Sequence, residues 1–336
     1  MVIFIKNYVG NPLQTRGAEQ YILQNGKGDG MHFVYVRNGL GLEAWISLDR
    51  CADLSRVIFK GDNYAFFGPC GYVAPEYYNV DGTAFLESFN GGFCTTCGFS
   101  NVGGASEVDG VIYPMHGTAS NLPSTLTRID DDKDGLTVEA YVRDAVIFGK
   151  KLVLKRKYYF SYTENTIKLD DTVINEADFD TPFMILYHCN MGYPLLSENS
   201  KVVIPNEKYT PRDDEAAKYN DSALQMEKPQ DCFRERCYYY DVTAKNGRAS
   251  LGIYNKDINK GLVMAYDKST LPCFAEWKMM GKTDYVLGLE PGNCNPDGRA
   301  ALKAANKLRI LKPDESEKMS LTFTFVENEG KFDKLV

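Results

Sequence analysis

Hydrophobic and polar positions alternate with a period of two along most of the chain. In the first clear case, Leu42, Ala44 and Ile46 alternate with Glu43 and Trp45. Because successive side chains of a strand point to opposite faces, this period predicts strands with one buried face. The same interpretation applies to residues 136–143, 150–160, 166–175 and 319–325. A turn over 161–165 is expected to join two of these segments as an antiparallel pair.

Strand patterns recur from about residue 32 to 326, and helical patterns are short. The expected helices are 83–90, 213–219 and 299–307. Neither a regular βα alternation nor a glycine-rich nucleotide-binding motif occurs, which disfavours nucleotide-binding α/β folds. The pattern therefore predicts an all-β fold of mostly antiparallel strands with a few short helices.

No linker or internal repeat divides the sequence, so we expect a single β domain over 1–336 built from two large packed sheets. Residues 1–30 are interpreted as an N-terminal lead-in to this domain. Residues 207–236 are the most polar stretch and are expected to form a long excursion over the surface. Long loops on a rigid scaffold often border sites, although a solvated connection is the more common explanation.

Composition narrows the class of protein and its partners. The chain has 336 residues, 44% of them hydrophobic, and a net charge of -7. This content fills a sizeable core, and no basic run interleaved with aromatic residues is present, so nucleic acid and membrane surfaces are not expected as partners. The sequence shows neither a secretory signal nor an apolar run long enough to span a bilayer, which predicts a cytoplasmic protein.

The nine cysteines are scattered and odd in number, which indicates reduced thiols. The pair Cys94 and Cys97 has the C-x-x-C spacing of a metal or redox site. Because no second such pair or nearby histidine accompanies it, we expect structural thiols and no metal site.

Glu290 is the first candidate for chemistry. It follows the apolar segment 286–289 and precedes Pro291-Gly292, which predicts a buried strand ending in a turn. A carboxyl group in such a setting is partly desolvated and can accept a proton near neutral pH. The alternative is an ordinary carboxylate at the edge of a strand.

The three histidines can be considered one at a time. His188 follows the apolar run 183–187, where a strand is expected to end, and its imidazole can give and take a proton in one cycle. His116 lies in a loop rich in proline and glycine, where it is available to a ligand. For both, the alternative is a structural histidine satisfied by its surroundings. His32 lies within a predicted strand and is expected to be structural.

Two cations and a tryptophan complete the candidates. Arg50 and Lys278 each interrupt or end a partly apolar strand, so each needs either a protein carboxylate or the oxygens of a ligand as a partner. Trp277 either stacks on the apolar face of a sugar or fills the core.

Several motifs occur together and in order. They are Tyr187-His188-Cys189-Asn190, Gly288-Leu289-Glu290-Pro291-Gly292-Asn293 and Leu311-Lys312-Pro313-Asp314-Glu315, with Gly91-Gly92-Phe93-Cys94, His116-Gly117, Gly192-Tyr193-Pro194 and Glu276-Trp277-Lys278-Met279. In this combination, over roughly residues 30 to 326, the sequence resembles the aldose 1-epimerase (galactose mutarotase-like) superfamily. More narrowly, it resembles a bacterial branch of uncharacterised proteins in that superfamily.

The resemblance implies a β-supersandwich fold and a sugar-binding cleft on a sheet face, with no cofactor. It implies that His188 is the general acid and Glu290 the general base at the anomeric centre. Further substrate-binding candidates are His116, Arg50, Lys278, Asn190, Asn293 and Trp277.

This sequence departs from the pattern in two places. Thr118 follows His116-Gly117 where the branch is expected to carry an arginine, which would remove a cation from the cleft. The aspartate with which mutarotases hold a sugar hydroxyl has no clear match, and Asp213 or Asp214 is the nearest substitute.

The expected function is interconversion of the α and β anomers of a free sugar or sugar derivative by acid–base ring opening. One alternative is a carbohydrate-binding or sugar-sensing protein without catalysis on the same fold. A less favoured one is glycoside cleavage, which needs a second carboxylate opposite Glu290. The sequence leaves open which sugar is used and whether the chain forms a homodimer.

Overall fold

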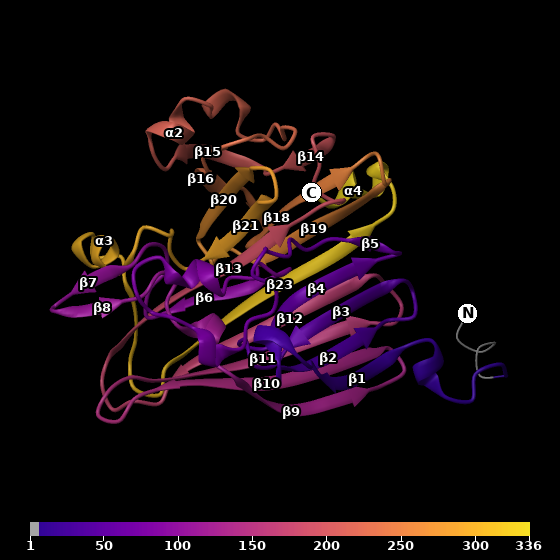
Figure 1. The fold of residues 1–336 in the computed structure, drawn as a ribbon, viewed down its shortest axis with the longest axis horizontal. Coiled ribbons are helices and arrows are strands. Elements are labelled where there is room, and N and C mark those ends of the chain that lie inside the picture. The colour runs from indigo at the N-terminus through magenta and orange to yellow at the C-terminus, as the bar shows by residue number, and fades with distance from the viewer. Residues whose placement is uncertain (1–6) are drawn as a thin grey trace.

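Strands dominate the computed structural model, which describes residues 7–336 (Figure 1). They form three large sheets and a small two-stranded one, β7 (Ser106–Val108) with β8 (Val111–Tyr113). Helices are few and short, and none of those in residues 7–336 has the length and apolar character needed to cross a bilayer. The predicted all-β fold is confirmed. Over the described residues 7–336, the helices are α2 (Asp214–Ala217), α3 (Arg299–Ala304) and α4 (Glu329–Leu335), with six 3-10 turns, η1 (Pro12–Gln14), η2 (Gly26–Gly28), η3 (Pro75–Tyr77), η4 (Ala84–Glu87), η5 (Ala119–Asn121) and η6 (Asn220–Ser222).

The first sheet has five antiparallel strands in chain order. Its first strand falls within the segment 1–30 that was interpreted as an N-terminal lead-in. Residues 1–6 of the lead-in lie outside the described residues. The strands are β1 (Gly17–Ile22), β2 (His32–Arg37), β3 (Leu42–Ser47), β4 (Asp53–Phe59) and β5 (Asp62–Asn63).

The second sheet has nine strands and contains the longest hairpins. The predicted turn near 161–165 joins two of its strands, which pair from Leu152 opposite Asn175 to Phe160 opposite Ile167. The strands, in order across the sheet, are β14 (Ser200–Val203), β18 (Arg248–Asn255), β19 (Lys260–Asp267), β23 (Ser316–Val326), β12 (Thr166–Asn175), β11 (Lys151–Ser161), β10 (Gly135–Ala145) and β9 (Ser124–Asp131), with β17 (Ala244–Lys245) beside β18.

The third sheet has seven strands and carries the residues of interest. In order, they are β15 (Asn206–Pro211), β16 (Arg236–Val242), β20 (Cys273–Met280), β21 (Tyr285–Gly292), β13 (Thr181–Met191) and β22 (Arg309–Leu311), with β6 (Thr95–Phe99) beside β13. One continuous hydrophobic cluster joins all three large sheets, with Val34, Leu154 and Leu287 as examples from each. The third sheet therefore has one face in the core, and its other face is available for a site.

Two predicted strand ends are wrong. Pro291 and Gly292 were expected to form a turn, but they continue β21, because β20 pairs with them through Phe274 and Cys273. Likewise, β13 continues past His188 to Met191. Both candidate catalytic residues therefore lie within strands, where ladder hydrogen bonds fix their backbones.

The polar segment 207–236 begins within β15, leaves the third sheet after Pro211, forms α2 and η6, and rejoins the sheet at β16 (Figure 1). The helix begins where the side chain of Asp213 accepts a hydrogen bond from the backbone N–H of Ala216. The Tyr238 hydroxyl donates to the carbonyl oxygen of Ala216 and fastens the segment to the sheet. The two ends of this excursion therefore enter the sheet as neighbouring strands.

Candidate functional site

The pairing of β13 with β21 places His188 directly opposite Glu290, on the sheet face that points away from the core. Their chain neighbours Cys189 and Leu289 point the other way, into the hydrophobic cluster. Side chains directly opposite each other on antiparallel strands are neighbours on one face. The His188 Nε2 to Glu290 Oε1 distance is 3.2 Å, and the residues are only 5% and 2% exposed. The strand register by itself therefore assembles an imidazole–carboxyl pair.

A glycine gives the carboxyl group its position. Gly288 lies two residues before Glu290 on the same strand and faces the same way. A Cβ atom built at Gly288 would lie 2.3 Å from Glu290 Oε1. The Glu290 carboxyl group therefore occupies the space that a side chain at position 288 would fill.

A pocket of about 450 Å³ opens over this pair. This volume lies within the range of small-molecule sites, and the lining combines a mainly apolar wall with a few convergent polar groups. The polar or aromatic lining residues are His116, His188, Glu290, Trp277, Arg212 and Glu235, and the apolar wall is formed mainly by Phe85, Leu86, Phe89, Met115 and Pro296.

His116 reaches the pocket from the loop after β8. Its backbone adopts the left-handed conformation, with φ of 54°, and bonds to Gly103 and Gly98. The following residue must be glycine, because a Cβ atom at Gly117 would lie 2.3 Å from the carbonyl oxygen of Gly98. The rings of His116 and His188 lie 5.6 Å apart, centroid to centroid. The two histidines predicted to act on substrate are therefore neighbours.

Burial controls the charge of these groups. It lowers the pKa of His188 to about 3, with a further contribution from His116, and lowers the pKa of His116 to about 4. Burial raises the pKa of Glu290 well above the usual carboxyl range, and the negative charge of Glu235 raises it further. Both histidines are therefore neutral at neutral pH, and burial favours the protonated form of the Glu290 carboxyl group. Within residues 7–336, neither His188 Nδ1 nor Glu290 Oε1 has a hydrogen-bond partner.

Two charged residues of the pocket were not predicted from the sequence. Arg212 and Glu235 come from the two ends of the polar excursion, and Arg212 Nη2 donates to Glu235 Oε1 at 2.8 Å. The other oxygen of Glu235 accepts from Trp277 Nε1 at 2.7 Å. Thr118 stands where an arginine was expected, but the cleft still contains a cation, because Arg212 supplies one from another segment. No motif surrounds either residue, and their only signal was their place at the ends of a long polar loop.

The structure does not place Arg50, a predicted substrate-binding residue, in the lining of the pocket. Its buried guanidinium donates to three backbone carbonyl oxygens, those of Ser120 at 2.5 Å, Val73 at 2.8 Å and Ser88 at 3.2 Å. Arg50 therefore holds together the segments that lie behind the pocket wall.

Lys278 also lies outside the pocket, because it points to the face of the sheet opposite to Trp277. Its ammonium group lies 3.2 Å from Glu227 Oε1 and also donates to the carbonyl oxygens of Ser222 and Gln225. These contacts hold the excursion in place.

The two candidate asparagines are likewise engaged in the protein. Asn190 donates to the carbonyl oxygens of Gly91 and Gly92. Asn293 accepts from the backbone N–H of Ile185 at 2.9 Å, and neither asparagine lines the pocket. Of the eight predicted site residues, the structure thus brings four together: Glu290, His188, His116 and Trp277.

The remaining candidates lie elsewhere. His32 is 55% exposed at its side chain and pairs with Asp49. Cys94 and Cys97 are buried free thiols. In the described part of the chain, no group of three or more histidine, cysteine, aspartate or glutamate side chains is arranged to hold a metal ion. Asp213 pairs with Arg212 at 3.1 Å and lies beside the pocket but does not line it.

Crystal structures of other proteins share this fold. A Klebsiella pneumoniae protein provisionally assigned as an aldose 1-epimerase matches with a TM-score of 0.90 at 24% identity, over 94% of this chain and 85% of that one. A galactose mutarotase-like protein from Clostridium acetobutylicum matches with a TM-score of 0.68 at 16% identity, over 94% and 99%. The galactose 1-epimerase of Lactobacillus acidophilus matches with a TM-score of 0.62 at 15% identity, over 94% and 100%. The predicted mutarotase-like fold is confirmed.

No protein with a curated description matches the sequence. One family model does match, over residues 28–325, and it is described as a domain of unknown function, DUF4432. This result agrees with the uncharacterised branch indicated by the motifs. The chain therefore belongs to the DUF4432 family, with the fold of the galactose mutarotase-like proteins.

Proposed function

We propose that this protein interconverts the α and β anomers of a sugar by acid–base ring opening, with Glu290 as general base and His188 as general acid. The observation that carries the proposal is the 3.2 Å approach of His188 Nε2 to Glu290 Oε1 on the floor of a buried pocket. Fold neighbours that bear aldose 1-epimerase names support the reaction class.

The chemistry requires two groups that exchange roles. Glu290 takes the proton of the anomeric hydroxyl while His188 protonates the ring oxygen, so the bond from C1 to the ring oxygen breaks without leaving isolated charge. Rotation about the C1–C2 bond presents the other face of the carbonyl group. The ring then closes with both proton transfers reversed.

The proton inventory of the pocket suits this cycle. Burial favours a protonated Glu290 beside a neutral His188, and transfer of the carboxyl proton to His188 gives a carboxylate base beside an imidazolium acid. The total number of protons is the same before and after this transfer. No proton from solvent is therefore needed to reach the reactive form.

His116 and Trp277 are assigned to binding. The backbone N–H of Gly103 donates to His116 Nδ1 at 3.4 Å, which places the ring proton on Nε2, where it can be donated to a sugar oxygen. The Trp277 indole is held by Glu235 and offers a face for the apolar side of a sugar ring.

The test is exchange NMR on a panel of sugars, with the wild-type protein and the variants Glu290→Gln and His188→Asn. Loss of a general acid or base is expected to lower the enzymatic rate by about 10²- to 10⁴-fold in each variant. Glu276→Gln is the matched control, because Glu276 is also a buried carboxyl group on a neighbouring strand but hydrogen-bonds Tyr240 on the opposite face of the sheet. Its exchange rate is expected to stay within about twofold of wild type, since the pocket is untouched.

Three outcomes contradict the proposal. Unchanged rates in both site variants would remove Glu290 and His188 from the chemistry. Tight sugar binding without any rate enhancement would indicate a binding or sensing protein. Release of new reducing ends from an oligosaccharide would indicate glycoside cleavage, with Glu235 as the second carboxylate.

A further inference from the structure

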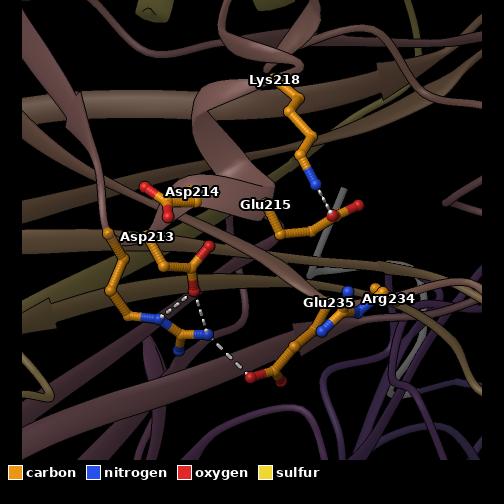
Figure 2. A pocket seen from close by; sticks show the side chains of 7 residues that line it. Asp213, Asp214, Glu215, Lys218, Arg234 and Glu235 are labelled. Carbon is orange, nitrogen blue, oxygen red and sulfur yellow. Dashed lines mark hydrogen bonds and ion pairs between the residues drawn. The ribbon is translucent and has the colours of Figure 1, made fainter.

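A second cavity adjoins the acid–base pocket and has a different character. Its volume is about 580 Å³, and every residue lining it is charged (Figure 2). Arg212 and Glu235 line both cavities, so this ion pair forms their common border. A ligand whose anomeric carbon lies at Glu290 can therefore extend past the border into the second cavity.

The charges of this cavity nearly cancel. Three cations face four carboxylates. Arg212 bridges Asp213 and Glu235, and Lys218 pairs with Glu215 at 3.0 Å (Figure 2). These ion pairs fix the positions of the side chains. The oxygen lone pairs and N–H groups that they do not use can form hydrogen bonds with a ligand. The lining residues are Arg212, Lys218, Arg234, Asp213, Asp214, Glu215 and Glu235.

Such a surface favours hydroxyl groups over an anion. A hydroxyl can donate to a carboxylate and accept from a guanidinium or ammonium group. A phosphate or carboxylate would instead meet an excess of negative charge, and Arg212, the cation shared with the acid–base pocket, is already engaged by two carboxylates. Burial keeps His116 and His188 neutral, so neither of them offsets an anion.

Resting on the proposed function, we infer that the charged cavity is a subsite for the second ring of an uncharged reducing disaccharide. The reducing ring lies against Glu290 and His188, and the next ring crosses the Arg212–Glu235 border. Asp214 and Arg234 are then available for its hydroxyl groups, since within residues 7–336 their side chains make no ion pair or hydrogen bond. The substrate class is thereby narrowed from any sugar to a neutral sugar of at least two rings.

The first experiment compares neutral reducing disaccharides with their own reducing-end monosaccharides. Lactose, maltose and cellobiose are each paired with glucose, and xylobiose is paired with xylose, in anomer-exchange NMR. For at least one pair, kcat/KM is expected to be about tenfold or more higher for the disaccharide, which corresponds to about 1.4 kcal/mol of added binding to the transition state. Equal values in every pair, or a general preference for monosaccharides, overturn the inference.

The second experiment tests whether the charged cavity causes the preference for disaccharides over monosaccharides. The double variant Asp214→Ala/Arg234→Ala removes one acid and one cation from its lining. The control Asp221→Ala/Lys228→Ala removes the same charges from exposed positions of the same excursion that do not line it. The ratio of disaccharide to monosaccharide kcat/KM is expected to fall about tenfold in the first variant and to stay unchanged in the control. Equal effects of the two variants contradict the inference.

The outcomes separate the two proposals. If no sugar of the panel is interconverted, the proposed function fails. If monosaccharides are interconverted but no disaccharide is preferred, only the subsite fails. A phosphorylated or acidic disaccharide that reacts faster than its neutral counterpart overturns the assignment to an uncharged ligand.

Discussion

At the scale of the residue, Gly288 positions the Glu290 carboxyl group by leaving space for it. We expect Gly288→Ala to lower anomer interconversion by about 10- to 100-fold, because a methyl group 2.3 Å from Oε1 displaces the reacting oxygen. Little change in melting temperature is expected, since the displaced group is the end of a flexible side chain. Exchange NMR together with a thermal melt measures both effects.

Gly330→Ala in α4 is the matched control for this substitution. There, an added Cβ atom meets nothing closer than 3.8 Å, and the helix lies against the second sheet. Full activity in Gly288→Ala would show that the position of the carboxyl group does not depend on this space.

The opposite pKa shifts of His188 and Glu290 also predict a pH profile. His188 takes up a proton as pH falls toward its pKa of about 3, and Glu290 loses its carboxyl proton as pH rises through its raised pKa. Enzymatic kcat/KM is therefore expected to fall as pH drops toward 3 and to fall again at a pH above the usual carboxyl range.

The variant Glu235→Gln tests the electrostatic part of this argument. Its amide oxygen can still accept from Trp277, but its negative charge, which raises the pKa of Glu290, is gone. The alkaline limb of the profile is expected to move to lower pH. An unchanged limb, or a shift to higher pH, would show that a different group controls it.

At the scale of the elements, a buried ionic cluster joins strands of all three large sheets beneath the site. Arg156 on β11 contacts Asp171 on β12 and Asp53 on β4, both at 2.6 Å. Tyr187 on β13 donates to the same Asp171. The strand that carries His188 is thus fastened to the nine-stranded sheet behind it.

We expect Arg156→Leu to lower the free energy of unfolding by about 3 to 5 kcal/mol, because it leaves two buried carboxylates without a cation. Arg143→Leu on the neighbouring β10 is the control, since its ion pair with Glu176 is about half exposed and is expected to contribute less than about 1 kcal/mol. Denaturant unfolding monitored by fluorescence measures both. Similar losses in the two variants would contradict a special role for the buried cluster.

Element boundaries also show where the sequence was misleading. Pro291-Gly292 is a common turn signal, yet these residues extend β21, because β20 and β13 hold the strand from both sides. Local turn propensity was outweighed by tertiary pairing. The excursion 207–236 contributes Arg212 and Glu235 to the pocket, and this contribution was not predicted from the sequence.

At the scale of the molecule, the three large sheets enclose one core, and the third sheet keeps one face for the site. Its core-facing side chains fix the backbone, and the alternate ones form the floor of the pocket. The chain carries a net charge of -7, and the border cation Arg212 is balanced by its own carboxylate partners. This electrostatic setting disfavours an anionic ligand, in agreement with the inferred subsite.

The sequence by itself determined the strands, because a period of two reports directly which side chains are buried. Together with the ordered motifs, it also determined the mutarotase-like fold and four residues of the pocket. Tertiary structure decided the rest, since burial and pairing between distant segments leave no local pattern. Only the fold shows that Arg50 and Lys278 hold backbone segments in place, that Arg212 and Glu235 meet at the pocket, and that His188 lies opposite Glu290.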